Sequence, residues 1–368
     1  MERRGLETSG CRPSAVCRSR VTHPAPSTLR TVTTRIGLMG FGRIGRNVFR
    51  QSWGRRDLEV AAIVDIADPA ALAYLLEYDT IFGRFPEPID FEDGHLVVGD
   101  RRIPMLSSPE PGDVDWSEHE VEVVVQATRR HRTAVECARH LDRGAKRVVL
   151  ASTPEDPADM DTVVIGANDH LLGPEDRMVA LGSNTSNALA PILKVLDGAF
   201  GVEKAIFTVV HAFTNEQRLA DVPGDDFRTS RAAAENIIPT ATNSAEIIQI
   251  VLPQFAGKIA GIALNVPVSD GSNVDLVTIL GKETDPKGVN AAIREAARSS
   301  DVIEYTEDPI VSSDIIGNTH SAIWDGLVTM VVGGTMVKSV TWFDNGWGYA
   351  ARVIDVIEKL AAFEKVPA

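Results

Sequence analysis

Three glycines at residues 40, 42 and 45 carry the clearest chemical signal in this chain. The segment Gly40-Phe41-Gly42-Arg43-Ile44-Gly45 follows a short apolar run and precedes a helical pattern. Glycines at this spacing permit a tight turn and let a pyrophosphate approach the backbone at a helix N-terminus. The segment therefore predicts a dinucleotide-binding turn.

An acidic residue, Asp65, ends the next apolar run and stands twenty residues after Gly45. A carboxylate there can accept hydrogen bonds from the adenosine ribose hydroxyls. Because it would also repel a 2′-phosphate, the pattern favours NAD over NADP. The alternative is that Asp65 only flanks the helix that begins near Asp68. Arg129 and Arg130 could soften the preference for NAD, although surface charge is the commoner explanation for such a pair.

Histidine and cysteine provide the other candidates for reactive groups. His211 lies in an apolar, strand-like run, where a satisfied core residue is the ordinary interpretation. The three cysteines are Cys11, Cys17 and Cys137, and no close pair has zinc-ligand spacing. This excludes a disulfide scaffold and a thiolate metal site. The remaining histidines show no metal spacing, so we expect no metal.

The elements that must position these residues alternate between strand and helix in the first half of the chain. Continuous β-branched runs are typical of strands buried on both faces of a parallel sheet. The pattern predicts an α/β fold: an N-terminal Rossmann domain at 34–182 with a doubly wound parallel sheet. Strands are expected at 36–39, 60–64, 121–125, 148–151 and 163–166, and helices from the glycine loop to about 53, at 69–78 and at 132–141.

The strands lengthen after about residue 182 and predict a second, α+β domain of catalytic type at 183–347, with a mainly antiparallel sheet. The final segment, 348–368, contains an amphipathic helix at about 348–363. Strands of the second domain are expected at 205–213, 261–267, 274–281, 327–332 and 339–343, and helices at 187–200, 244–251 and 286–298.

Length and charge narrow the class of protein. The 368 residues are 44% hydrophobic and 24% charged, which is globular composition, and the length suggests two domains. A net charge of −14 argues against nucleic acid and anionic membrane as partners. No apolar run approaches the ~18 residues of a membrane span, so a soluble, cytoplasmic protein is expected.

Residues 1–33 differ from the remainder, with six Arg, no Lys and two Glu. They cannot bury enough apolar surface to fold alone, so we expect a disordered leader. An organellar transit peptide is the alternative, but no amphipathic helix is evident.

The chain resembles the glyceraldehyde-3-phosphate dehydrogenase family from about Thr34 to Lys365. The resemblance implies NAD as cofactor, a small-molecule substrate, a C-terminal helix that packs on the Rossmann domain, and usually a homotetramer. It also implies an extended loop near 213–236 that approaches a neighbouring subunit's cofactor. The stretches that carry it are Arg35–Arg46, Leu76–Arg84, Arg231–Pro239 and Trp342–Asn345, and the cofactor contacts that it implies are Phe41, Arg43, Ile44, Asp65, Thr128 and Asn345.

One departure from the family changes the expected chemistry. The family's nucleophile lies in a Ser-Cys-Thr-Thr-Asn-Cys motif, and this chain reads Ser183-Asn184-Thr185-Ser186-Asn187-Ala188. Family chemistry needs a thiolate that attacks the aldehyde and carries a thioester. An amide nitrogen is no nucleophile, because its lone pair is delocalised. Cys11 and Cys17 lie in the leader and Cys137 on a predicted helix, so ordinary glyceraldehyde-3-phosphate oxidation is not expected.

Other positions retain or alter the family's site. His211 matches the general base, whereas Asn184 could cap the following helix or hydrogen-bond a substrate oxygen, and both remain open. The family's phosphate arginine is Asn265 here, and an amide cannot replace that charge, although Arg228 and Arg231 are close in sequence. The positions that match the anion sites are Ser183, Thr185, Thr214, Glu216, Arg231, Thr242 and Asn243, where Asn243 replaces a glycine.

These observations leave three functional hypotheses. The first is an NAD-dependent oxidoreductase of this family, repurposed for a small aldehyde or alcohol, with His211 as base and Asn184 positioning the oxygen. The second is a catalytically silent member that binds NAD and has a regulatory or assembly role. The third is a non-redox enzyme that uses His211 on a small metabolite.

Overall fold

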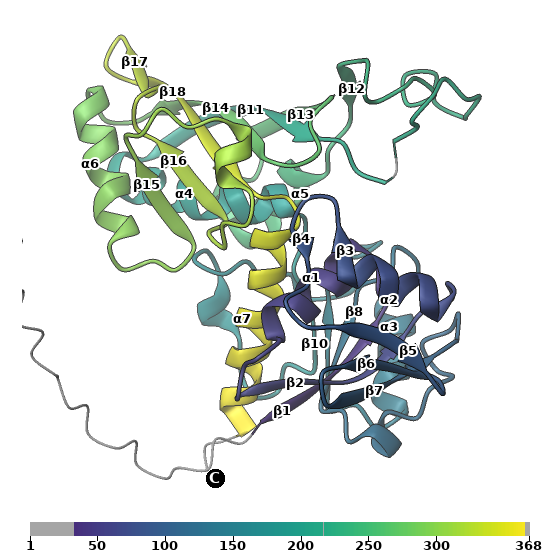
Figure 1. The fold of residues 1–368 in the computed structure, drawn as a ribbon. Coiled ribbons are helices and arrows are strands. Elements are labelled where there is room, and N and C mark those ends of the chain that lie inside the picture. Colours follow the sequence, from purple (N-terminus) through teal and green to yellow (C-terminus); the bar gives the residue numbers. More distant parts are fainter. Residues whose placement is uncertain (1–32, 216, 365–368) are drawn as a thin grey trace, which may run out of the picture. The chain divides into compact units, whose positions relative to one another are not determined.

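The computed structural model describes residues 33–215 and 217–364. Two large sheets carry the helices of this part of the chain (Figure 1). The predicted leader, apart from Thr33, and the last four residues of the predicted C-terminal segment lie outside the described residues, and so does Glu216. The helices are α1 (Arg43–Ser52), α2 (Pro69–Glu77), α3 (Ala134–Asp142), α4 (Asn184–Phe200), α5 (Ser244–Val251), α6 (Pro286–Ala297) and α7 (Trp347–Glu364).

The first sheet is the doubly wound sheet that the sequence predicts. Its strand order is β10-β9-β8-β1-β2-β7-β6-β5, and all neighbours from β10 to β7 are parallel. Hairpins add β6 and β5 in antiparallel register at the edge. The strands are β1 (Thr34–Met39), β2 (Leu58–Val64), β5 (Ile89–Glu92), β6 (His95–Val98), β7 (Arg101–Leu106), β8 (Val123–Gln126), β9 (Arg147–Leu150) and β10 (Met178–Ala180).

Continuous apolar runs form the central strands of this sheet because both of its faces are covered. Val123, Val124 and Val125 of β8 are all buried, as are Ile36 and Leu38 of β1. A central strand with two covered faces needs no polar alternation. The arrangement places the carboxyl ends of β1 and β8, and therefore the glycine loop that follows β1, at one edge of the sheet.

The second sheet has the order β12-β13-β11-β14-β18-β16-β15, with β17 paired to β18. Its pairs are antiparallel except β11 with β13 and β15 with β16, so the predicted mainly antiparallel sheet is confirmed. The strands are β11 (Val202–Ala212), β12 (Ile238–Thr240), β13 (Ile259–Val266), β14 (Ser272–Leu280), β15 (Ile303–Thr306), β16 (Ala322–Asp325), β17 (Met330–Val332) and β18 (Met336–Phe343), and a separate small ribbon is β3 (Tyr78–Asp79) with β4 (Gly83–Arg84).

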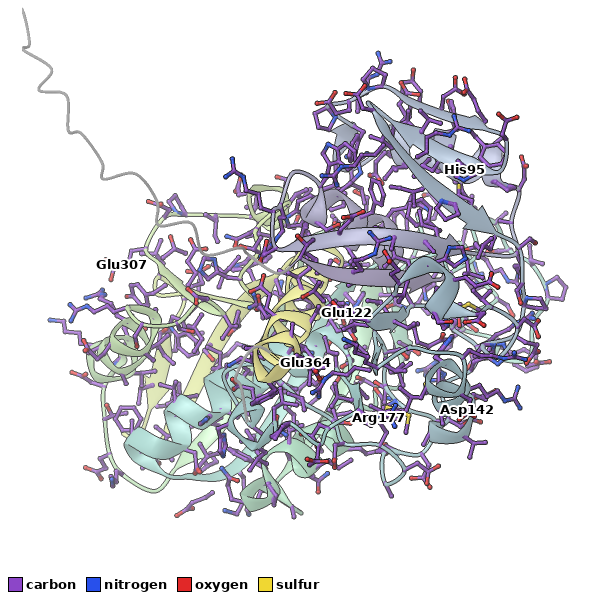
Figure 2. The ribbon with its side chains drawn as sticks, turned by 90° about the horizontal axis from the view of Figure 1, so that it is seen from below. His95, Glu122, Asp142, Arg177, Glu307 and Glu364 are labelled. Carbon is purple, nitrogen blue, oxygen red and sulfur yellow. The ribbon has the colours of Figure 1, made fainter. Side chains whose placement is uncertain are left out.

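Helix α7 returns from the second sheet to the elements of the first. Its first residue, Trp347, accepts a hydrogen bond from Gln51 Nε2 of α1 at 2.8 Å. At its far end Glu364, labelled in Figure 2, lies 2.8 Å from the buried Arg147 of β9. An apolar stripe that includes Val353, Val356 and Ile357 is buried along its length. Helix α7 therefore contacts both α1 and β9.

Two predicted strands are wrong. Val163, Val164 and Ile165 are buried, but only a single bridge joins Thr162 to Ala180, and the amide of Val164 donates to the Asn168 side chain. The Asn168 side chain accepts the backbone hydrogen bond that a neighbouring strand would otherwise accept, so this apolar run forms no strand. The predicted strand at 327–332 is interrupted, and only β17 forms there, after Asp325 ends β16.

In the part of the chain that the structure describes, no helix is long and apolar enough to cross a bilayer. Asp142, Arg177 and Glu307, which are labelled in Figure 2, are exposed charged side chains at the periphery of the fold.

Candidate active site

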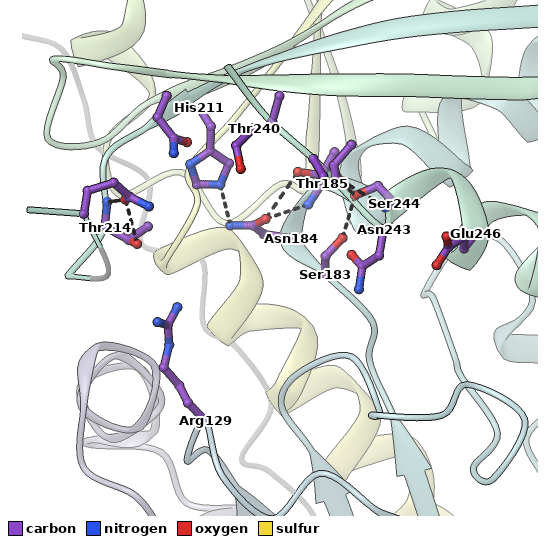
Figure 3. Close-up of a pocket in the computed structure, with 15 residues that line it drawn as sticks. Arg129, Ser183, Asn184, Thr185, His211, Thr214, Thr240, Asn243, Ser244 and Glu246 are labelled. Atoms are coloured by element: carbon purple, nitrogen blue, oxygen red, sulfur yellow. Dashed lines mark hydrogen bonds between the residues drawn. The ribbon is translucent and has the colours of Figure 1, made fainter. Parts of the chain in front are cut away.

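A cavity of about 570 Å³ opens where the parallel strands β11 and β13 end (Figure 3). The N-terminus of α4 and the segment before α5 complete its walls. Hydroxyl and amide groups dominate the lining, which consists of Arg129, Ser183, Asn184, Thr185, His211, Thr214, Gln217, Thr240, Ala241, Thr242, Asn243, Ser244, Glu246, Ala263 and Asn265.

His211 is fixed in one tautomer at the carboxyl end of β11. Its Nδ1 lies 2.6 Å from the Ala212 carbonyl oxygen. Since a carbonyl only accepts, Nδ1 carries the proton and Nε2 keeps its lone pair. Burial is the main cause that lowers the pKa of His211; the hydrogen bond to Ala212 partly opposes it, and the charge of Arg43 lowers the pKa by a smaller amount. The ring is therefore a neutral base at pH 7, with Nε2 toward Asn184 (Figure 3).

Asn184 is the first residue of α4, and its carboxamide joins three groups. Nδ2 donates to the Asn345 carbonyl oxygen at 3.0 Å and lies 3.4 Å from His211 Nε2. Oδ1 accepts from the Thr185 amide at 2.8 Å. The interpretation of Asn184 as a helix cap is wrong, because Ser183 is the N-cap and forms a capping box with Ser186. The helix thus begins three residues before the predicted 187.

Hydroxyl groups beside Asn184 form a short chain of hydrogen bonds. Ser183 Oγ lies 3.0 Å from Ser244 Oγ, which also accepts from Thr242 Oγ1 at 2.9 Å. The chain ties the N-terminus of α4 to that of α5. These hydroxyls fix the wall of the cavity and leave further acceptor sites toward its interior.

A second cavity, of about 470 Å³, adjoins the first and shares Asn184, Arg129 and Thr214 with it. It extends along the N-terminus of α1 to the carboxyl ends of β8 and β9. Its lining is Gly42, Arg43, Ile44, Ala127, Thr128, Arg129, Arg132, Ala151, Ser152, Thr153, Gly182, Ser183, Asn184, Thr214, Asn215, Asn243, Asn345 and Tyr349.

The glycine loop fits a dinucleotide at this second cavity. A Cβ at Gly45 would lie 2.2 Å from the Gly40 carbonyl oxygen, so only glycine lets α1 start so close to β1. A Cβ at Gly42 would meet nothing within 4 Å, which leaves open space at the cavity wall. Gly42 is also the N-cap of α1 and supplies no side-chain cap. The uncapped amides at this positive helix end are suited to a pyrophosphate.

Asn345 is held from three sides at the boundary of the two cavities. Its amide donates to Asp270 Oδ1 at 3.3 Å, its Oδ1 accepts from Ser272 at 3.2 Å, and its carbonyl accepts from Asn184. Its side-chain nitrogen has no partner among the described residues, and the residue lines the second cavity. Burial, and then the neighbouring Asp344, raise the pKa of Asp270 to about 6, and burial also raises the pKa of Asp344.

Residues 34–134 match the glyceraldehyde 3-phosphate dehydrogenase NAD binding domain, and residues 183–345 match the C-terminal domain of the same enzyme. A glyceraldehyde-3-phosphate dehydrogenase of Kitasatospora aureofaciens is 46% identical over 333 residues, which cover 89% of this chain and 99% of that protein. The chain belongs to the glyceraldehyde-3-phosphate dehydrogenase family.

Other members of this family are similarly related. Glyceraldehyde-3-phosphate dehydrogenase 2 of Streptomyces avermitilis is 42% identical over 329 residues, covering 88% of this chain and 98% of the relative. The enzyme of Borreliella burgdorferi is 41% identical over 335 residues, covering 89% and 99%. The chain is thus an NAD-binding member of an oxidoreductase family, and NAD is its cofactor.

The structure brings most of the site residues predicted from the family resemblance to the two cavities. Gly40, Phe41, Gly45 and Asp65 stand behind the cavity walls. Phe41 is buried against Phe49, and Asp65 Oδ2 accepts from the Phe41 amide at 2.6 Å. Those that line a cavity are Gly42, Arg43, Ile44, Thr128, Ser183, Asn184, Thr185, His211, Thr214, Thr242, Asn243 and Asn345.

Arg231 does not reach either cavity. It is exposed and forms an ion pair with Asp221 at 3.0 Å. Several lining residues are not predicted by any sequence pattern, among them Tyr349, Gln217 and Arg132. Tyr349 donates to the Gly182 carbonyl oxygen at 2.8 Å, a contact between segments far apart in sequence that no local pattern announces.

Cysteine is absent from the described lining of both cavities of this family member. Cys137 is buried in α3, where burial and then Glu136 raise the pKa of its thiol to about 12. A thiol in that state is not a nucleophile. Cys11 and Cys17 lie outside the described residues. Among residues 33–215 and 217–364, no cluster of three His, Cys, Asp or Glu side chains could hold a metal ion.

Proposed function

We propose that this chain is an NAD-dependent oxidoreductase that acts on a small aldehyde or alcohol without a thioester intermediate. The observation that carries the proposal is the pairing of a neutral His211 with Asn184, 3.4 Å apart, in a cavity whose described lining contains no cysteine. The named relatives are glyceraldehyde-3-phosphate dehydrogenases, so the proposal gives this chain a different reaction on the same fold.

His211 would act as the base. NAD, when bound, supplies the two-electron acceptor of such a reaction. Nε2 holds a lone pair toward the cavity, so it can take the hydroxyl proton of an alcohol or of an aldehyde hydrate. The bond from Nδ1 to the Ala212 carbonyl stabilises the imidazolium that results. Arg43 opposes that charge, which favours rapid release of the proton.

Asn184 would orient the reacting oxygen. The 3.4 Å separation from His211 is long for a hydrogen bond, so a substrate hydroxyl can take the place of the imidazole as acceptor of Nδ2. Its second hydrogen bond, to the Asn345 carbonyl, keeps the carboxamide in place during the exchange. Asn345 would hold the cofactor's carboxamide, and Arg43 and Ile44 would lie along its pyrophosphate.

The sequence resemblance implies self-association. It would use the face of the second sheet opposite to the one that carries His211. Ile206 of β11 and Ile262 of β13 are 59% and 51% exposed there. Apolar side chains gathered on one sheet face are suited to burial against a second copy. We therefore propose a homotetramer, which light scattering would test.

The experiment is a titration with NAD by fluorescence quenching, followed by a panel of small aldehydes and alcohols with absorbance of reduced cofactor as readout. We expect NAD binding and turnover of at least one compound, independent of inorganic phosphate. NAD binding with no turnover on the panel would favour the silent, regulatory reading. Phosphate-dependent oxidation of glyceraldehyde 3-phosphate at the full rate would contradict the proposal.

A further inference from the structure

Asn265 is a buried polar residue without a partner in the first cavity. It is only 7% exposed and lines the cavity from β13. Its carboxamide makes no hydrogen bond to another residue in the part of the chain that the structure describes. The carboxamide is open to the cavity and is not sealed in the core. A ligand that enters the cavity can therefore form hydrogen bonds with both ends of this amide.

The strand register places this amide beside the proposed base. Asn265 of β13 is the parallel partner of His211 of β11, so the two side chains lie on the same face at the carboxyl ends of neighbouring strands. On its other side Asn265 pairs with Ile238 of β12. The backbone of Asn265 therefore pairs with β11 on one side and with β12 on the other. A ligand group bound by the carboxamide would lie one strand spacing, about 4.8 Å, from the imidazole.

The neighbours of Asn265 in the cavity are also neutral. Thr240 of β12 pairs with Ala263, two residues from Asn265 on β13, and Asn243 is the N-cap residue of α5. Neither side chain has a hydrogen-bond partner among the described residues. The charged lining groups stand elsewhere. Glu246 is exposed, and Arg129 comes from the elements of the first sheet and also lines the second cavity.

We infer that Asn265 forms a subsite for a hydroxyl group, and that the substrate is a short, unphosphorylated hydroxyaldehyde or polyol. A carboxamide offers both a donor and an acceptor, and a hydroxyl answers both. A phosphate dianion offers acceptors only and leaves the Asn265 oxygen facing a negative charge. This wall carries no cation, so nothing on it offsets the free-energy cost of removing water from the phosphate. Oxidation of this substrate rests on the proposed function, whereas its binding at Asn265 does not.

The test compares D-glyceraldehyde with D-glyceraldehyde 3-phosphate on the wild type and three variants. Asn265→Leu removes the hydrogen bonds at similar volume, and Asn265→Arg adds a cation. Gln254→Leu, at an exposed position between α5 and β13 that lines neither cavity, is the control. We expect the wild type to favour D-glyceraldehyde at least tenfold in kcat/KM. Asn265→Leu should lose about tenfold, mainly in KM, and Asn265→Arg should shift the preference to the phosphate ester.

A second readout separates this inference from the proposed reaction. Diethyl pyrocarbonate modifies His211, and either compound protects the ring when it binds, whether or not it is oxidised. With no turnover of either compound the proposed oxidation fails, while protection at a tenfold lower concentration of D-glyceraldehyde than of its phosphate ester still supports the subsite. Better protection or faster turnover with the phosphate ester in the wild type would overturn the inference, as would equal behaviour of wild type and Asn265→Leu.

Discussion

The two adjoining cavities are built in different ways. The cavity at the glycine loop is shaped by backbone: the uncapped amides of α1, the absent side chain of Gly42 and the close approach of Gly45 to Gly40. The cavity at His211 is shaped by side chains from five segments, and replacing any of these side chains changes its chemistry. A backbone site preserves its ligand across a family, whereas a side-chain site on the same fold can change its reaction.

The largest effect should follow from altering the backbone site. In Gly45→Ala the new methyl group would lie 2.2 Å from the Gly40 carbonyl oxygen, so the loop must move. We expect NAD affinity to fall by about two orders of magnitude or the fold to be lost, as measured by fluorescence titration and thermal unfolding. Gly198→Ala in α4 is the control, since its methyl group meets nothing within 4 Å. It should bind NAD normally and gain about 0.5–1 kcal/mol in the free energy of unfolding.

The difference between the cavities also explains what could be predicted from sequence. The glycine loop and α5, whose limits match the prediction, follow from local patterns. The edge hairpins were missed, although Asp93 and Gly94 both have positive φ, at 48° and 75°, and an Asp-Gly pair signals such a turn. The strands beside it mix charged and apolar residues, which hid the alternation.

The side-chain cavity was only partly predictable, for a physical reason. From sequence, Asn184 could equally be a helix cap or a substrate contact; in the structure Ser183 is the cap, and the carboxamide of Asn184 bonds to Asn345, 161 residues away. Contacts at such separations depend on how the two sheets pack. Local propensity does not specify them.

The next largest effect concerns the proposed base. His211→Asn should lower kcat/KM by about 10², the lower end of what a general base contributes, with NAD affinity and the fold unchanged, measured by steady-state kinetics and NAD titration. For the wild type, the lowered pKa of His211 sets the acidic limb. Protonation removes the base, so activity should persist below pH 6.5 and decline only as the pH falls through the lowered pKa. A limb above pH 6.5, or full activity in the variant, would exclude His211 as the base.

A cysteine introduced at the side-chain cavity should be unusually reactive. In Asn184→Cys the thiol would sit at the N-terminus of α4 beside His211, which lowers its pKa and makes it nucleophilic. Peptide mass spectrometry after brief iodoacetamide treatment should find residue 184 alkylated at least tenfold faster than Cys137. Cys137 is the internal control because it is buried and its pKa is raised to about 12. Equal labelling of the two would show that the site does not activate a thiol.

The smallest effect concerns the support of Asn345. The folded state favours protonated Asp270, whose pKa is raised to about 6 from 3.8. The resulting penalty is absent near pH 4, grows as the pH rises toward 6, and is constant above it. Asp270→Asn should therefore stabilise the fold by about 1–3 kcal/mol at pH 8 relative to pH 4, measured by urea unfolding. The exposed Asp308→Asn should show no such difference, and an equal change at both pH values would contradict the assignment.

The central claim is that this chain oxidises its substrate without a cysteine nucleophile. The most direct measurement is the rate of NADH formation from D-glyceraldehyde, without inorganic phosphate, before and after complete alkylation of accessible thiols by iodoacetamide. We predict a measurable rate that alkylation changes by less than twofold, because no cysteine lines the described parts of either cavity. Loss of the rate on alkylation would contradict the account, and so would its absence without added phosphate.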